Sequence, residues 1–382
     1  MPRDLVDPRF LTDGGIHSRL PPVGTVLDGK YRIEGYVGSG SVGCVAKARH
    51  LVLEADVALK FLASTGPARA RLPERFRREA IATSRVRTEH VVQILDVVEE
   101  RDQLPYLVME FLDGDDLRQI ISREGALPLA RALHIVLQVL CALEAAHEAQ
   151  VIHRDLKPAN VFVLKRGGDR DFVKVVDFGI SKVEETGVRH TRLTQGEVAM
   201  GTPLYMAPEQ ARDARSVTAT ADVYSAAALL YECLTGSPPL TAPTTEALFE
   251  MLLRDVPARL DQVLPQMPSG LSDAVAAALE KSPKARPPSA AAFARLLAPY
   301  ADVGAGSLSW LRGSDVPETR PQGTPAPAEV TVTVRPRPRA PATHRPLAES
   351  ASPLMLALLG AVGFGLTFLA GVLLLRVLGI AR

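Results

Sequence analysis

Residues 153 to 160 read HRDLKPAN and run directly into the apolar segment VFVL. Such a density of charged and polar groups around a proline suits neither a regular helix nor a strand, so the stretch is predicted to be a loop beside a buried strand. The loop holds a carboxylate, an ammonium group and an amide, on Asp155, Lys157 and Asn160. A second carboxylate, Asp177, follows the apolar run FVKVV and opens the tripeptide DFG.

These four groups suit the transfer of a phosphoryl group to a hydroxyl. That reaction needs a carboxylate to orient the hydroxyl, a cation near the moving phosphoryl group and oxygen ligands for a hard metal ion. Asp155 can supply the first and Lys157 the second. Asn160 and Asp177 can supply the third. His153 is interpreted as a packed, hydrogen-bonded scaffold residue.

A glycine-rich stretch, GSGSVGCV, lies at residues 38 to 45. Glycines let backbone N–H groups approach a phosphate closely, because no Cβ stands in the way. Alone, the pattern is at least as typical of a plain hairpin turn as of a phosphate-binding loop. A dinucleotide-binding loop requires a helix directly after the glycines, whereas CVAKARH continues as a strand, which excludes that class. Val45 is expected to cover a bound base.

Lys60 lies in the apolar strand pattern DVALKFL. A buried lysine needs a charge partner, although simple alternation along the strand would leave Lys60 exposed. Glu79, in the helical segment RFRREA, is preferred as the partner over Glu74 and Glu89. It lies one helical turn beyond Phe76, which is expected to face the core.

The elements that must position these groups change in character along the chain. YRIEGYV, CVAKARH, DVALKFL, VVQILDVVEE and LPYLVMEFL predict strands, whereas helices are predicted from Pro128 onward, including 219–235 and 271–281. The apolar residues at helical spacing after Pro128 are Leu133, Val136, Leu137 and Leu140. A strand-rich lobe before a helix-rich lobe predicts an α+β fold with a cleft between the lobes.

Taken in order, the motifs resemble the eukaryotic-type (Hanks-type) serine/threonine protein kinases that bacteria carry on their membranes. The resemblance covers residues 31–297 and includes GSGSVGCV, VALK, a helix glutamate, HRDLKPAN, DFG, GTPLYMAPE, DVYS and KSPKARP. It implies a two-lobed protein kinase fold, with a β-rich N-lobe at about 31–112 and an α-helical C-lobe at about 113–297. DLKPAN, with Lys157 two residues after the expected base, resembles the serine/threonine branch.

The resemblance implies ATP as the phosphoryl donor and Mg²⁺ as the metal, with Mn²⁺ as an alternative. Asp155 would be the catalytic base, Lys157 and Asn160 would complete the catalytic set, and Asn160 and Asp177 would bind the metal. Met109 resembles the gatekeeper that precedes the adenine-binding hinge. The nucleotide-binding set implied is Val37, Gly38, Ser39, Gly40, Gly43, Val45, Ala58, Lys60, Glu79, Met109, Glu110 and Leu112.

Within that set, Lys60 would pair with Glu79 and touch the ATP phosphates, and Glu110 and Leu112 would present backbone groups to adenine. Two scaffold contacts are also implied. Glu209 would form an ion pair with Arg286, and Asp222 would brace the catalytic loop from a helix.

The segment between DFG and APE is expected to carry a phosphorylation switch. The threonines there are Thr186, Thr191, Thr194 and Thr202. Thr202 resembles a structural residue, and Thr191 and Thr194, in the polar stretch HTRLTQGEV, are the preferred sites. Arg154 beside the base would bind the phosphate and order the segment. The alternative is that Arg154 pairs with a carboxylate of the same segment, leaving the kinase always active.

Composition excludes some other classes. The 382 residues include 44 Lys plus Arg and 43 Asp plus Glu, so the net charge of +1 gives no drive toward nucleic acid. Cys44, Cys141 and Cys233 form no CxxC pair, which fits a reduced compartment with each thiol buried as a small apolar group.

The two ends differ from the folded domain. Residues 1–30 are predicted to be a tail without a signal peptide, and residues 303–353 a Pro-rich disordered linker. Residues 354–375 carry no charge over 22 positions, about 33 Å as a helix, which predicts a transmembrane helix rather than a buried core helix. Residues 376–382 would form a short C-terminal tail, so no sensor domain is expected after the span.

The expected protein is a single-pass, tail-anchored kinase of the cell membrane, with its kinase domain in the cytoplasm. More arginines precede the span than follow it, which favours that orientation. The arginines before it are Arg335, Arg337, Arg339 and Arg345, and those after it are Arg376 and Arg382. The expected partners are proteins bearing Ser or Thr, the lipid bilayer, and a second copy for trans-autophosphorylation. The alternatives are an ATP-binding pseudokinase and a membrane-tethered scaffold whose linker recruits partners.

Overall fold

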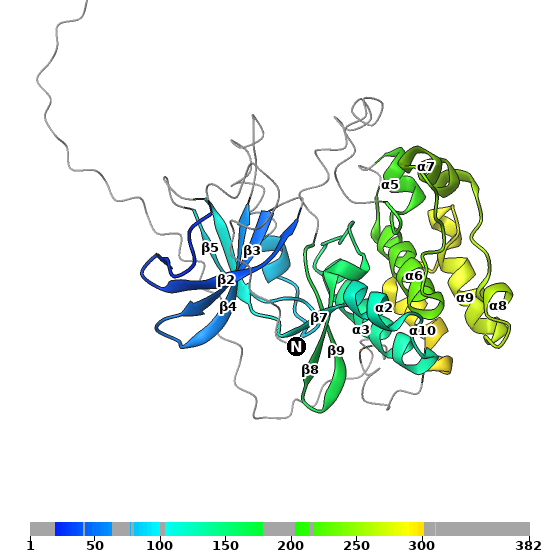
Figure 1. The fold of residues 1–382 in the computed structure, drawn as a ribbon. Helices are drawn as coiled ribbons and strands as arrows, with labels where there is room; N and C mark the ends of the chain where they lie inside the picture. Colours follow the sequence, from blue (N-terminus) through cyan, green and yellow to red (C-terminus); the bar gives the residue numbers. More distant parts are fainter. Residues whose placement is uncertain are drawn as a thin grey trace, which may run out of the picture. The chain divides into compact units, whose positions relative to one another are not determined.

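The five predicted strands of the first lobe, joined by a two-residue strand that was not predicted, form one six-stranded antiparallel sheet in the computed structural model of the chain, drawn in blue and cyan in Figure 1. The sheet has the order β1-β2-β3-β4-β6-β5. Its strands are β1 (Val26–Leu27), β2 (Tyr31–Gly40), β3 (Gly43–His50), β4 (Ala55–Leu62), β5 (Ile94–Val98) and β6 (Tyr106–Glu110). The structure describes residues 20–40, 43–62, 77, 80–99, 104–178, 203–213, 217–301 and 310.

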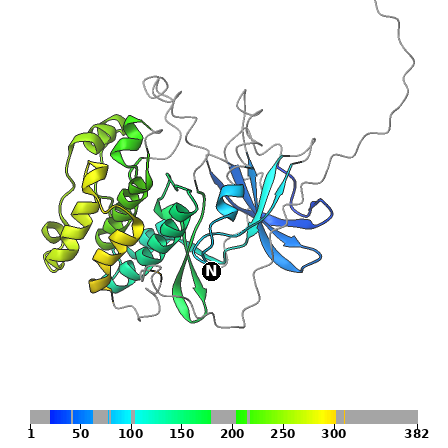
Figure 2. The ribbon, with the colours of Figure 1, turned by 180° about the vertical axis from the view of Figure 1, so that it is seen from behind.

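The core of this sheet is built from aromatic rings on three strands. Tyr36, Phe61 and Tyr106 are almost completely buried. The centroid of the Phe61 ring lies 6.3 Å from that of Tyr36 and 5.5 Å from that of Tyr106. Ring pairs at these distances add stabilisation beyond their buried area. On the other face, the helical turn at residues 80–84 lies against the sheet (Figure 2), where Ala80 packs with Ile94 and Leu107.

The register of the sheet brings predicted nucleotide-binding residues opposite one another. Val45 on β3 pairs with Lys60 on β4, and Ala58 on β4 pairs with Met109 on β6. Side chains at paired positions lie on the same face of an antiparallel sheet. The strands therefore align Val45 with Lys60, and Ala58 with Met109.

The second lobe is helical, as predicted. Its α-helices are α2 (Leu117–Glu124), α3 (Leu129–Glu148), α5 (Pro208–Arg212), α6 (Ala219–Thr235), α7 (Thr245–Arg254), α8 (Leu260–Val263), α9 (Ser269–Ala278) and α10 (Ala290–Leu297). Helices α3, α6 and α10 pack against one another around the largest apolar cluster (Figure 1). The four apolar residues predicted to face the core of α3 are all buried there.

Two helices test the predicted boundaries. Helix α6 covers the predicted range 219–235 and ends at Gly236, whose φ of 76° is the left-handed conformation that glycine adopts without strain. Helix α9 begins earlier and ends earlier than the predicted 271–281. Pro268 precedes its first residue, and it stops at Ala278, a turn ahead of the extended Ser282 that comes before Pro283.

A small three-stranded sheet lies beside these helices and frames the loop HRDLKPAN. It consists of β7 (Gly114–Asp116), β8 (Val161–Arg166) and β9 (Asp169–Val175), in that order. A Cβ on Gly114 would lie 2.3 Å from the carbonyl oxygen of Val163, so only glycine allows β7 to approach β8 this closely. Strand β8 follows the loop and β9 leads to Asp177.

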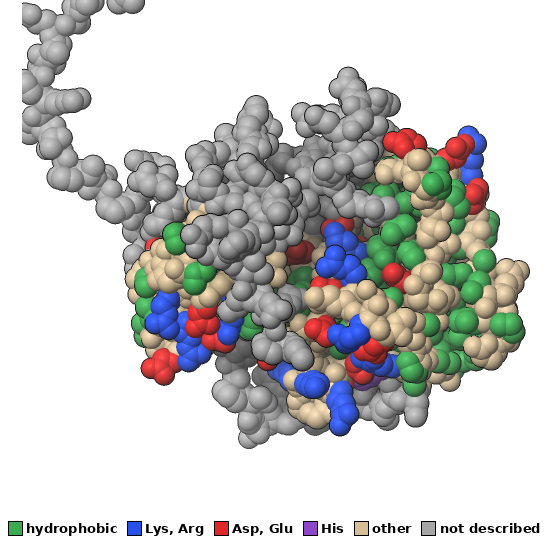
Figure 3. Space-filling model, in the orientation of Figure 1, with side chains coloured by type: hydrophobic (Ala, Val, Ile, Leu, Met, Phe, Trp, Pro, Cys, Tyr) green, Lys and Arg blue, Asp and Glu red, His purple; other side chains and the backbone are tan. Residues whose placement is uncertain are grey.

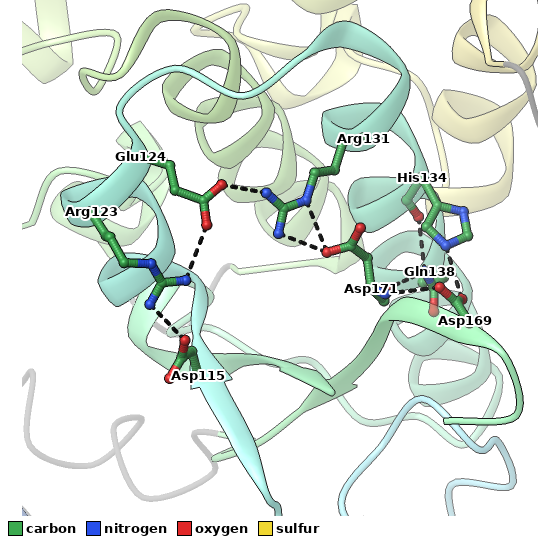
Figure 4. A network of polar contacts seen from close by, with 8 residues as sticks. All are labelled: Asp115, Arg123, Glu124, Arg131, His134, Gln138, Asp169 and Asp171. Carbon is green, nitrogen blue, oxygen red and sulfur yellow. Dashed lines mark hydrogen bonds and ion pairs between the residues drawn. The ribbon is translucent and has the colours of Figure 1, made fainter. Parts of the chain in front are cut away.

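Polar side chains attach this small sheet to α2 and α3. Arg131 on α3 bridges Glu124 and Asp171, and Arg123 bridges Asp115 and Glu124 (Figure 4). Figure 3 shows the same region as neighbouring red and blue side chains on the surface. Charge alternation of this kind holds the strands and helices in one arrangement, although exposed pairs contribute little energy each.

The cysteines and the apolar helix α3 bear on two predictions about location. Cys44 and Cys233 are buried as expected, whereas Cys141 is half-buried. Burial raises the pKa of Cys44 and of Cys141 to about 11, so both thiols are inert at neutral pH. In the part of the chain that the structure describes, α3 is the helix long and apolar enough to cross a membrane, and it is a core helix. The predicted span at 354–375 lies outside the described residues.

Candidate active site

The loop between α3 and β8 brings its three predicted catalytic residues together. The Lys157 ammonium lies 2.9 Å from Oδ2 of Asp155. Nδ2 of Asn160 donates to the backbone oxygen of Asp155 at 2.8 Å, within a 3₁₀ turn that covers Pro158–Asn160. Because its amide nitrogen is engaged in this way, Asn160 has its side-chain oxygen available as a ligand atom.

A buried carboxylate on α6 holds the backbone of this loop. Asp222 accepts hydrogen bonds from the backbone N–H groups of His153 at 2.8 Å and Arg154 at 2.9 Å, and from Nε2 of His147 at 2.7 Å. Burial would raise the pKa of Asp222, but the contact with His147 lowers it below its ordinary value. The expected brace is present, and it fixes Arg154 at a φ of 62°, a strained conformation for a non-glycine residue.

His153 is the scaffold residue that the sequence indicates. Its side chain is completely buried, and Nε2 lies 3.0 Å from the backbone oxygen of Val176. Its ring packs against Phe178 with centroids 4.6 Å apart. Burial lowers the pKa of His153, which keeps the imidazole neutral. His153 therefore joins the catalytic loop to the segment that carries Asp177.

Asp177 lies directly across from Lys60. The Lys60 ammonium is 2.5 Å from Oδ1 of Asp177, and a hydrogen bond from Val176 N to Asn160 O at 3.0 Å links this segment to the catalytic loop. Loss of hydration in the folded protein would raise the pKa of Asp177, but the charge and hydrogen bond of the Lys60 ammonium outweigh this effect, so the pKa lies below its ordinary value. The side chain of Asp177 keeps 44% of its surface exposed, so a ligand can still reach the carboxylate.

Lys60 itself is buried, with 8% of its surface exposed, which rules out the alternative of a solvent-facing lysine. Glu79, its expected partner, lies outside the described residues. The structure thus places Lys60 between the sheet and the carboxylate of Asp177, where a cation would meet the phosphates of a nucleotide.

The other predicted nucleotide-binding residues lie on β2, β3 and β4, at the end of β6 and, in the case of Leu112, just after it. Ala58 and Leu112 are buried, Val37 and Met109 are half-buried, and Gly38 is exposed. Ser39 and Gly40 belong to β2, and Gly43 begins β3. Glu110 ends β6, and its carboxylate contacts Lys174, a residue to which the motifs gave no role.

Asn160 and Asp177 suit the binding of a divalent cation. In the described ranges no group of three His, Cys, Asp or Glu side chains is arranged to hold a metal ion. Mg²⁺ does not need such a cage, because it is commonly bound by one or two carboxylates together with substrate phosphates. An accessible carboxylate on Asp177 and an amide oxygen on Asn160 fit that requirement.

An ion pair within the helical lobe, between Glu209 and Arg286, supports the site. Both Nη atoms of Arg286 contact the carboxylate of Glu209, at 2.7 and 2.8 Å, and its guanidinium lies 5.0 Å from the centre of the Tyr224 ring. The predicted pair of Glu209 and Arg286 is therefore present. Two supporting residues escaped prediction, His147 on Asp222 and Gln210, whose Nε2 donates to the backbone oxygen of Arg154 at 2.9 Å.

Two lobes that bring together a buried lysine, a loop carboxylate with its neighbouring amide, and a second, accessible aspartate have the arrangement of a phosphotransferase of the kinase class. The chain matches the protein kinase domain over residues 31–296, and it belongs to that family.

Similar proteins are bacterial serine/threonine kinases. The chain is 39% identical over 273 residues to the serine/threonine-protein kinase pkn3 of Myxococcus xanthus, with 71% of this chain and 50% of the relative covered. It is 35% identical to the serine/threonine-protein kinase PknH of Mycobacterium bovis, with 76% and 48% covered. The chain thus spans about half the length of these curated relatives.

Solved structures agree with this assignment. The crystal structure of the Mycobacterium tuberculosis PknI kinase domain superposes with a TM-score of 0.57 at 26% identity, covering 74% of this chain and all of that one. The crystal structure of Rad53 1-466 in complex with AMP-PNP superposes with a TM-score of 0.57 at 25% identity, covering 69% and 64%. Both likenesses support the two-lobed kinase fold.

Proposed function

We propose that the protein is an ATP-dependent serine/threonine protein kinase, which transfers the γ-phosphate of ATP to Ser or Thr hydroxyls of proteins. The observation that carries this proposal is that two carboxylate–ammonium contacts lie next to each other in the site. Asp155 meets Lys157 in the catalytic loop, and Asp177 meets Lys60 beside it. One pair suits the acceptor hydroxyl and the other suits the phosphates of the donor.

Each residue of the site has a separate task in this mechanism. Asp155 orients the acceptor hydroxyl and takes its proton, while Lys157 stabilises charge on the moving phosphoryl group. Lys60 holds the phosphates of the donor. Asn160 and Asp177 would hold Mg²⁺, or Mn²⁺ in its place, and the ion when bound neutralises the charge of the phosphate oxygens.

The test is a transfer assay with γ-labelled ATP and a generic acceptor protein, followed by analysis of the labelled amino acid. Label on Ser or Thr with wild-type protein, and a large loss of that label with Lys60→Met, is expected. Label on Tyr would contradict the serine/threonine assignment. Binding of ATP without any transfer would favour the alternative of a pseudokinase or scaffold.

We further propose that the kinase switches on by phosphorylation of its own activation segment. Arg154 supports this, because its Nε is buried and has no hydrogen-bond partner in the described part of the chain. Burial lowers the pKa of Arg154, so an anion beside it would be strongly favoured. A phosphate on Thr191 or Thr194 would provide that anion and order the segment beside Asp155.

Mass spectrometry after incubation with ATP tests the switch. The expected result is phosphate on Thr191 or Thr194 in wild type but not in Asp155→Asn. The variant with alanine at both threonines should have reduced activity. Full activity in that variant would rule the switch out. A rate of self-labelling per molecule that rises with protein concentration would support transfer between two copies.

Attachment to the membrane is a separate proposal. The uncharged segment 354–375 supports a single membrane-spanning helix joined to the kinase domain by the Pro-rich linker 303–353, and the excess of arginines before it favours a cytoplasmic kinase domain. Deletion of 354–375 should move the protein from the membrane fraction to the supernatant. Digestion of the linker by protease added outside intact cells would contradict the orientation.

A further inference from the structure

Lys174 is a buried ammonium group that the catalytic motifs do not use. It lies on β9, three residues before Asp177, and only 7% of its side chain is exposed. Its Nζ donates to Oε1 of Glu110 at 2.5 Å and to the backbone oxygen of Val91 at 3.3 Å. A buried ammonium is strongly destabilising unless a carboxylate accompanies it, so Glu110 is the counter-ion that permits this burial.

Glu110 is fixed from a second direction as well. Its Oε1 also accepts from the backbone N–H of Gln93 at 2.7 Å, and its own backbone N–H donates to the oxygen of Gln93 at 3.0 Å. Both the side chain and the backbone of Glu110 are therefore held. Glu110 ends β6 at the point where the backbone is expected to receive the adenine of ATP.

The segment before β5 extends this attachment along β9. Val92 N donates to the oxygen of Val175 at 3.0 Å, and Val175 N donates to the oxygen of His90 at 2.8 Å. Residues 90–93, the end of β6 and the end of β9 therefore form one hydrogen-bonded unit. Strand β9 leads from this unit directly to Asp177, which pairs with Lys60 at the phosphate side of the site.

We infer that Glu110 and Lys174 form a positioning pair for nucleotide binding, an inference that rests on the proposed kinase function. The pair fixes the backbone that receives the base relative to the aspartate at the phosphate end. Without it, the end of β6 gains freedom that a bound nucleotide must remove, which weakens binding. The chemical step is spared, because Asp222 braces Asp155 and its loop independently.

The test uses the full chain with Glu110→Gln, Lys174→Met and the double variant. Equilibrium binding gives the Kd for ATP, and steady-state assays give KM and kcat. Each single variant is expected to raise Kd and KM by about ten-fold, the scale of a typical coupling between sites, with kcat changed by less than about two-fold. The double variant should bind ATP no more weakly than either single variant, because each single substitution already removes the same contact.

Asp171→Asn is the matched control on the same strand. Asp171 accepts from Nε of Arg131 at 2.9 Å and from Nη2 at 2.8 Å, and so ties β9 to α3 without touching the end of β6 (Figure 4). It should lower Tm and leave the Kd for ATP unchanged. The Kd for ATP of Glu110→Gln and of Lys174→Met is measured at a temperature well below the Tm of each variant. Misfolding is then not mistaken for weakened binding.

Two results would overturn the inference. One is a Kd for ATP within about two-fold of wild type in both single variants, with Tm lowered as in the control, which is the signature of a purely structural pair. The other is a loss of kcat with KM unchanged. If wild type binds ATP but transfers no phosphate, the proposed function fails, and the Kd comparison still decides the role of the pair.

Discussion

The two carboxylates of the site are held in different ways. Asp155 lies in a loop whose backbone donates to one buried carboxylate, Asp222, and whose His153 is packed beneath it. Asp177 meets Lys60, a residue 117 positions away on strand β4 of the first lobe. The side proposed to handle the hydroxyl is therefore organised within the helical lobe, whereas the proposed phosphate side is assembled from both lobes. Changes on the two sides should have separable effects on transfer and on nucleotide binding.

The largest effect is expected on the assembled side. Lys60→Met removes the ammonium that lies between the sheet and Asp177, so transfer should fall about a thousand-fold, and the Kd for ATP should rise. Arg49→Met is the matched control, because Arg49 lies near the far end of the neighbouring strand β3 and pairs with Asp56. Comparable losses in both variants would show that the sheet, and not the Lys60 ammonium, is responsible.

A large effect on stability alone is expected far from the phosphates. Arg286→Ala leaves the carboxylate of Glu209 buried without its partner, which should lower the free energy of unfolding by about 3–5 kcal/mol. Urea denaturation measures this change. Glu250→Gln, in the exposed pair with Arg254, should cost only about 0.3–0.5 kcal/mol. Folded Arg286→Ala protein should retain its Kd for ATP, and a weakened Kd would contradict the separation of the two regions.

A smaller effect on rate is expected when the brace of the catalytic loop is weakened. Asp222→Asn keeps one acceptor oxygen but loses the charge, so kcat should fall by about 10–100-fold, the value of hydrogen bonds to a charged group. The Kd for ATP should stay close to that of wild type. Steady-state and binding assays on the same preparation measure kcat and the Kd for ATP. If the affinity for ATP fell by as large a factor as kcat, the loop would also position the nucleotide.

The motifs predicted which residues of the site lie together better than they predicted the residues that support them. Asp155, Lys157 and Asn160 could be placed together because they share one short loop. The burial of Lys60 followed from the apolar residues on either side of it. Long-range partners were harder, because a contact such as Lys174 with Glu110 depends on two sheets meeting and leaves no periodic signal in the sequence.

The fold followed a similar division between local and distant signals. The strands from Tyr31 to Glu110 and the helix at 219–235 follow from local patterns of apolar residues. The three-residue strand β7 was not predicted, because its formation depends on Gly114 approaching β8. The end of α9 was placed too late, since the pattern of apolar residues continues beyond Ala278 while the backbone turns before Pro283.

The smallest expected effect is a dependence of stability on pH. Burial lowers the pKa of His153 and of His90 below their ordinary value of 6.5. The unfolded chain therefore binds protons more readily, so their contribution to stability is complete above pH 6.5 and is lost as the pH falls below it. Urea denaturation between pH 7.5 and 5.5 measures the slope. His90→Gln should reduce that slope, and an unchanged slope would exclude His90 as a contributor.

The most direct test of the division between the two carboxylates is to measure ATP binding and phosphoryl transfer together in Asp155→Asn. The substitution keeps the size of the side chain and removes the group that orients the hydroxyl and takes its proton. Transfer should fall by about a hundred-fold or more, while the Kd for ATP stays within about two-fold of wild type. Near-normal transfer would contradict the assignment of Asp155 as the base, and a lost affinity for ATP would contradict its placement on the acceptor side.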